Sequence, residues 1–156
     1  MTQHRVLRGA AAGCAAIVPM TIVMEALRAV LPAEQHRRMP PREVVDRTIE
    51  KAEEAVGDAE MDSNDRIALT TVVHLAVGAA AGALYGATTR ARRPPVFMGI
   101  AYGLAVWAVA YGVGLPSLGL HPAAARDTSD RNEVLIASHV VWGAALATLL
   151  GSPVPK

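Results

Sequence analysis

Four long segments of this sequence contain almost no charged side chain, and no other feature constrains the fold as strongly. They cover residues 9–31, 67–88, 96–115 and 134–151. Each is close to the roughly 20 residues that a helix needs to cross a hydrocarbon layer about 30 Å thick. A helix on the surface of a soluble protein would repeat charged residues along one face, and these segments do not. The sequence therefore predicts an all-α fold, a four-transmembrane-helix bundle in a single integral membrane domain.

The first loop, residues 32–66, is the only sizeable polar region. Pro40 and Pro41 suit the first turn of a helix, and apolar residues then recur at helical spacing from Val45 to Val56. This pattern predicts one extra amphipathic helix over about 41–56. Its apolar face is narrow and its charge is acidic, which favours capping the bundle or contacting a partner over binding anionic lipid.

Charges are distributed unevenly between the loops. All acidic residues except Glu25 lie in the first and third loops. The charged residues of the N-terminus, the second loop and the C-terminus are all basic, namely Arg5, Arg8, Arg90, Arg92, Arg93 and Lys156. Four spans would place these two sets on opposite sides of a membrane. The positive-inside rule then predicts that both termini are cytoplasmic.

Glycines spaced four residues apart follow one stripe of several predicted spans. Small residues at this spacing allow two helices to approach closely. Two spans also share a His-xxx-Gly frame, beginning at His74 and at His139, which suggests a weak parallel repeat about an axis along the membrane normal. The glycines expected to pack helices are Gly9, Gly13, Gly78, Gly82, Gly86, Gly99, Gly103 and Gly143.

Polar side chains from all four spans fall at a similar depth. Counting about 1.5 Å per residue from the outer helix ends places Glu25, His74 and His139 at nearly the same level. Trp107 and Tyr111 bracket that level on the third span. Ionisable groups inside a span usually face the bundle interior. We therefore expect these five residues to form a polar layer in the outer half of the bundle.

Two hypotheses give this layer a chemical role with protons or cations. Burial brings the proton affinities of carboxylic acids and imidazoles closer together, so the layer could exchange protons. Alternatively, Glu25, His74 and His139 are the ligand types of a two-His-one-carboxylate metal centre.

Two further hypotheses remain open. A b-type haem could lie between His74 and His139, with the glycine four residues after each histidine leaving room for the porphyrin. In a purely structural alternative, Glu25 pairs with Arg28 near the interface, and each histidine bonds a neighbouring helix. The sequence does not establish any cofactor.

Motifs of soluble enzymes are missing from the sequence. It contains no phosphate-binding glycine loop, no nucleophile elbow and no Cys-x-x-Cys pair, which argues against an enzyme. The arginines of the second loop are explained as a topology anchor, so no nucleic-acid partner is expected. Membrane lipids are the expected surroundings. A four-span chain of 156 residues is small for a complete transport path. This favours a homo-oligomer packed through the Gly-xxx-Gly stripes, or a structural or accessory subunit of a membrane complex.

The combination of these motifs resembles the YagU-like family of small bacterial inner-membrane proteins. The resemblance implies a multi-pass protein of the bacterial inner membrane, and it brings no established catalytic residues. The matching features, along nearly the whole chain, are Gly9-xxx-Gly13 with Glu25 and Leu31-Pro32, Pro40-Pro41, His74-xxx-Gly78-xxx-Gly82-xx-Tyr85-Gly86, Trp107 with Leu115-Pro116-xx-Gly119, and His139-xxx-Gly143.

Overall fold

The structure, a computed structural model, describes residues 2–31, 40–56, 62–89, 91, 93–121 and 126–152, and these residues contain no β-strand. Their helices are α1 (Thr2–Arg28), α2 (Pro40–Val56), α3 (Ser63–Thr88), α4 (Val96–Val109), η2 (Ala110–Gly114), α5 (Leu115–Ser117) and α6 (Ser129–Gly151). Four helical stretches are long and apolar enough to cross a membrane, namely Gln3–Arg28, Ser63–Thr88, Val96–Ser117 and Ser129–Gly151. The predicted all-α fold with four candidate spans is confirmed.

Most of these helices extend beyond the apolar segments. Hydropathy marks only the part of a helix that suits the hydrocarbon layer, and the helix itself continues until a cap or a breaker ends it. Thus α6 begins at Ser129, five residues before the apolar segment. Helix α3 begins after Asp62, whose carboxylate accepts a hydrogen bond of 2.6 Å from the backbone N–H of Ser63. Residues 32–39 and 57–61 of the first loop lie outside the described part.

The third span changes its winding before it ends. In the π-helical turn η2 the N–H of Leu115 bonds the carbonyl of Ala110, five residues earlier. Pro116 follows and has no N–H with which to continue the α-helical pattern. Such single π turns are often found at functional sites. Tyr111 is the buried residue of this turn.

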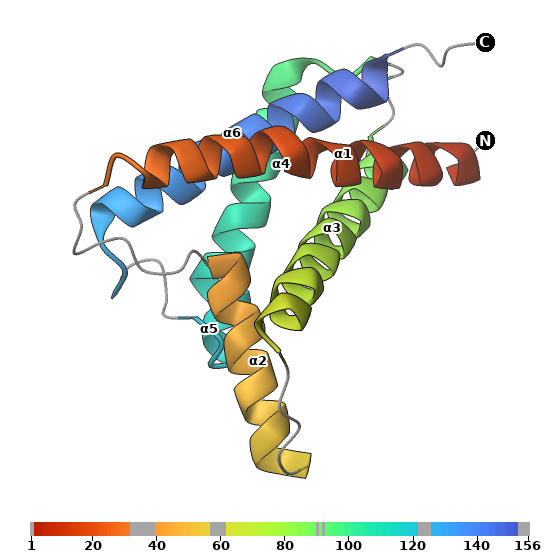
Figure 1. The fold of residues 1–156 in the computed structure, drawn as a ribbon. Coiled ribbons are helices and arrows are strands. Elements are labelled where there is room, and N and C mark those ends of the chain that lie inside the picture. The colour runs from red at the N-terminus through yellow and green to blue at the C-terminus, as the bar shows by residue number, and fades with distance from the viewer. Residues whose placement is uncertain are drawn as a thin grey trace.

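The four spans pack in the order α3–α1–α6–α4. Helix α1 packs chiefly against α3 and α6, and α6 packs chiefly against α1 and α4 (Figure 1). In the most apolar stretch of α6, 50% of the residues are buried inside the protein, against 11% in the corresponding stretch of α3. The core therefore lies along α1 and α6, where Trp142 donates a hydrogen bond of 3.0 Å to the carbonyl of Gly13.

Glycines line the contacts between α1 and α3 and between α4 and α6. A Cβ added to Gly13 would lie 2.7 Å from the Cα of Gly82, and one added to Gly103 would lie 3.2 Å from the Cα of Gly143. The same crowding surrounds the other glycines of the stripes, Gly9, Gly78, Gly86 and Gly99. All these contacts are made within one chain.

Arginines of the N-terminal turns bind backbone carbonyls at one end of the bundle. Arg5 donates to the carbonyl of Ala91 at 2.6 Å. Arg8 donates to the carbonyls of Leu150 at 3.0 Å and Ser152 at 2.7 Å, beside the last turn of α6. These bonds gather the N-terminus, the turn after α3 and the end of α6 on the same side (Figure 1). Arg90, Arg92 and Lys156 lie outside the described residues.

Candidate functional site

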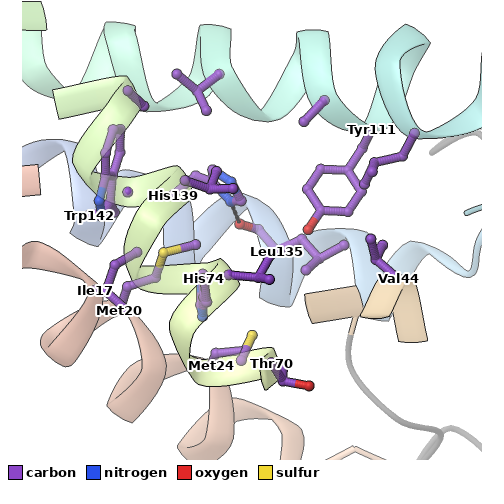
Figure 2. Close-up of a pocket in the computed structure, with 17 residues that line it drawn as sticks. Ile17, Met20, Met24, Val44, Thr70, His74, Tyr111, Leu135, His139 and Trp142 are labelled. Carbon is purple, nitrogen blue, oxygen red and sulfur yellow. Dashed lines mark hydrogen bonds between the residues drawn. The ribbon is translucent and has the colours of Figure 1, made fainter. Parts of the chain in front are cut away.

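A cavity of about 170 Å³ lies among the four spans, and its wall is mostly apolar (Figure 2). Helix α1 contributes Ile17, Met20 and Met24, and Val44 of α2 borders the cavity. Helices α3, α4, α5 and α6 complete the wall, and η2 adds Ala110 and Tyr111. His74 and His139 also line it, so both histidines of the expected polar layer face one space.

His139 of α6 has one ring nitrogen satisfied and one available. Its Nδ1 lies 2.8 Å from the carbonyl oxygen of Leu135, one turn earlier on its own helix. A carbonyl oxygen can only accept, so Nδ1 must carry the hydrogen, and Nε2 is the acceptor of the neutral ring. His139 is only 6% exposed. The structural hypothesis expected a bond to a neighbouring helix, and the bond found is intrahelical.

Tyr111 lies between two histidine rings. Its ring centroid is 5.8 Å from that of His139 and 5.5 Å from that of His121, with interplanar angles of 85° and 87°. These are edge-on aromatic contacts. The Tyr111 hydroxyl points into the cavity toward Leu135 (Figure 2), and within the described chain it has no hydrogen-bond partner.

His74 reaches the cavity from α3, on the side opposite α6. No hydrogen bond to its imidazole is found among the described residues. Its neighbours along the wall are the apolar side chains of Val73 and Val77. Three polar groups in this small apolar space therefore have no hydrogen-bond partner among the described residues: the His74 ring, the Tyr111 hydroxyl and Nε2 of His139. Buried polar groups usually find one.

Glu25 and Trp107 do not line the cavity. Glu25 accepts a charge-assisted hydrogen bond of 2.8 Å from Arg28, and its side chain is 48% exposed. Its neighbour Met24 takes the inward position instead. Trp107 packs beside the cavity, against a buried cluster that includes Met24 and Tyr111. Counting residues from the helix end gives the depth of a residue but not the direction in which its side chain points. This explains why Glu25 lies at the expected depth and yet does not line the cavity.

The metal and haem hypotheses find no assembled site among the described residues. The described residues contain no group of three or more His, Cys, Asp or Glu side chains placed to hold a metal ion. The room that a porphyrin would need beside the glycines is filled by protein. A Cβ on Gly78 would lie 2.6 Å from Ile17, and one on Gly143 would lie 2.8 Å from the carbonyl carbon of Gly99.

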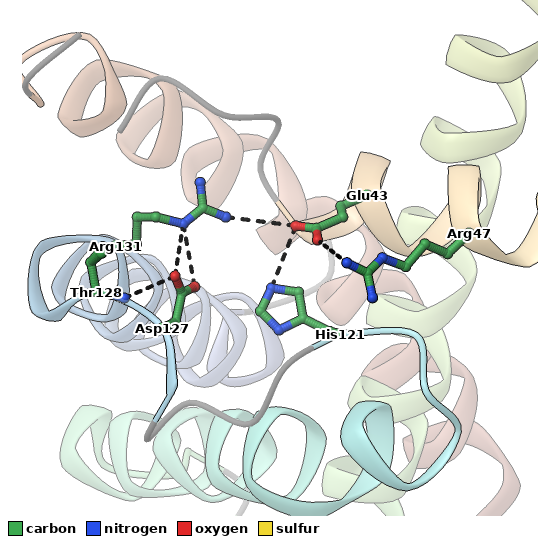
Figure 3. A network of polar contacts seen from close by, with 6 residues as sticks. All are labelled: Glu43, Arg47, His121, Asp127, Thr128 and Arg131. Carbon is green, nitrogen blue, oxygen red and sulfur yellow. Dashed lines mark hydrogen bonds and ion pairs between the residues drawn. The ribbon is translucent and has the colours of Figure 1, made fainter. Parts of the chain in front are cut away.

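A charged network that sequence reasoning missed connects α2 with the beginning of α6 and with His121, which follows α5 (Figure 3). Glu43 of α2 lies 3.0 Å from Arg47 and 3.7 Å from both His121 and Arg131. Arg131 also contacts Asp127 at 3.1 Å and is only 4% exposed. The available signal was the spacing of opposite charges at i and i+4, which occurs in Glu43–Arg47 within α2 and in Asp127–Arg131 at the start of α6.

This network is adjacent to the cavity. Glu43 precedes Val44, which borders the cavity, and His121 contacts both Glu43 and Tyr111. A line of titratable groups therefore runs from Glu43 through His121 and Tyr111 to His139.

Comparison with protein-family models, curated proteins and solved structures finds no match for this chain.

Proposed function

We propose that this chain is a multi-pass protein of the bacterial inner membrane with both termini in the cytoplasm, like the YagU-like proteins that its motifs resemble. The gathering of Arg5 and Arg8 at one end supports this orientation, because positive residues stay on the cytoplasmic side. The opposite end carries Glu43 and Asp127.

Labelling of single cysteines tests the orientation. In a Cys14→Ser background, Asn64→Cys at the start of α3 should react with a membrane-impermeant maleimide added to intact spheroplasts. Ser152→Cys should react only after the membrane is permeabilised. Both positions are exposed in the fold, so access to the reagent decides the result. The reverse pattern would contradict the proposed orientation.

We further propose that the layer formed by His74, Tyr111 and His139 handles protons. The observation that carries this proposal is the placement of Tyr111 edge-on between His121 and His139. Imidazole and phenol groups both donate and accept protons, and the outer end of the line meets the charged network at Glu43. About five waters, at roughly 30 Å³ each, would fit the cavity and bridge His139 to His74. A cation role has less support, since Glu25 lies outside the cavity.

Proton flux into liposomes tests this role. Purified protein is reconstituted around a pH-sensitive dye, and a pH step is applied. We expect dye acidification faster than in empty liposomes, and a return to the empty-liposome rate in the double variant His74→Gln/His139→Gln. His4→Gln, at an exposed position of α1, is the matched control and should keep the wild-type rate. Equal rates in wild type and the double variant would contradict proton handling.

The alternative is a structural or accessory subunit in a membrane complex. It is favoured by the low burial of the candidate spans Ser63–Thr88 and Val96–Ser117. Only 11% and 17% of their most apolar stretches are buried inside the protein. The double variant separates the two proposals. In a structural protein the substitutions change only the free energy of unfolding or the assembly state, and flux stays at the level of empty liposomes throughout.

A further inference from the structure

The polar groups in the cavity that have no hydrogen-bond partner among the described residues indicate which chemical group could bind there. Nε2 of His139 needs a donor, while the Tyr111 hydroxyl can donate and accept. Both side chains are more than nine-tenths buried, at 6% and 8% exposed. The His74 ring faces the same space without a hydrogen-bond partner in the described chain. A hydroxyl group, which donates one hydrogen bond and accepts others, matches this set.

The wall favours a neutral ligand. Among the described residues that line the cavity there is no Asp, Glu, Lys or Arg. A charge placed there would lose its hydration without gaining a counter-ion, which is costly. The rest of the wall is aliphatic, sulfur-containing or aromatic, so it suits an apolar body attached to the hydroxyl.

The volume of the cavity limits the size of the apolar part of the ligand. An apolar cavity of about 150 Å³ accepts a benzene ring. At about 170 Å³ this cavity can hold one six-membered ring with its hydroxyl, or an alcohol with a short chain. Drug-sized molecules need roughly 300–1,000 Å³.

The cavity is only partly enclosed by protein. Its wall includes Val73 and Val77 of α3, which are 37% and 57% exposed. In a membrane those side chains face acyl chains, so a molecule dissolved in the bilayer can reach the opening without crossing water.

We propose that this cavity is a binding site for a small neutral alcohol or phenol that enters from the bilayer, with its hydroxyl held by His139 and Tyr111. The site does not require proton transfer. Binding is measured directly, so the failure of either proposal leaves the other standing.

Fluorine NMR on the full chain in lipid nanodiscs tests the proposal, with para-fluorophenol as probe and protein-free nanodiscs as blank. We expect saturable binding of para-fluorophenol, and binding of fluorobenzene that is weaker by about tenfold because it lacks the hydroxyl. Ala110→Phe fills the cavity and should abolish binding. Ala108→Phe places the same side chain at an exposed position of α4 and should leave binding unchanged.

Tyr111→Phe provides a test that does not depend on tolerance of a large residue. It preserves the ring and removes the hydroxyl, so it should weaken para-fluorophenol binding by roughly threefold to tenfold and leave fluorobenzene binding unchanged. The proposal is overturned by wild-type signals equal to the blank, by equal effects of Ala110→Phe and Ala108→Phe, or by equal affinity for the two probes.

Discussion

Replacement of Gly82 by alanine is expected to lower the free energy of unfolding by about 2–3 kcal/mol, the cost of overpacking a close contact. The added Cβ would overlap the carbonyl oxygen of Gly9 and lie 2.7 Å from the Cα of Gly13. Both obstacles are backbone atoms, so no side-chain rotation can relieve them. Helix α1 has to move away from α3. Equilibrium unfolding in mixed micelles, followed by circular dichroism, measures the loss.

Gly112→Ala is the matched control for that substitution. Nothing lies within 4 Å of a Cβ added at Gly112. The change should alter the free energy of unfolding by less than about 1 kcal/mol, and the better helix propensity of alanine makes a small gain the expected sign. A similar loss in both variants would show that the contact between α1 and α3 is not what makes Gly82 sensitive.

Replacement of Arg131 by alanine should cost about 3 kcal/mol, as expected when one partner of a buried ion pair is removed. The Arg131 side chain is 5% exposed and lies between Asp127 and Glu43, whose side chains are 12% and 23% exposed. Without the guanidinium, two partly buried carboxylates lose a shared cation. Because Glu43 belongs to α2, the loss should also loosen that helix, and hydrogen exchange of the α2 amides should accelerate.

The ion pair of Arg28 with Glu25 is the control for Arg131. It has a shorter N–O distance, 2.8 Å, yet its side chains are 35% and 48% exposed. Exposed pairs contribute about 0–1 kcal/mol because water and salt screen them. Arg28→Ala should therefore change the free energy of unfolding by no more than about 1 kcal/mol. It should leave the hydrogen exchange of the α2 amides unchanged. Unchanged α2 exchange in Arg131→Ala would mean that α2 is held by its apolar contacts alone.

The spans were predictable because a bilayer imposes one strong requirement on sequence. Long uncharged segments are needed to cross it, and four helices with that property are present. The sequence is less informative about the direction in which each side chain points around the helix axis. Glu25 and His74 were placed at one depth, but only His74 lines the cavity, because Met24 occupies the inward position on α1.

Tertiary contacts between loops could not be read from the sequence. The contact of Glu43 with Arg131 joins residues that are 88 positions apart in the sequence. Its formation depends on how α2 packs against the other helices. The π-helical turn that positions Tyr111 was missed for a similar reason. Gly112, Gly114 and Pro116 are compatible with several ways of ending a helix, and packing selects one.

The glycine contacts also bear on how such a chain is made. Helix α1 packs on α3, and α4 packs on α6, so each close pair is built from consecutive spans. Synthesis proceeds from the N-terminus, and the first pair is complete before the second has left the ribosome. Each pair can insert into the bilayer as a hairpin, with its polar backbone satisfied within its own helices. Assembly then reduces to docking two preformed hairpins along α1 and α6, a late step that requires no span to thread between others.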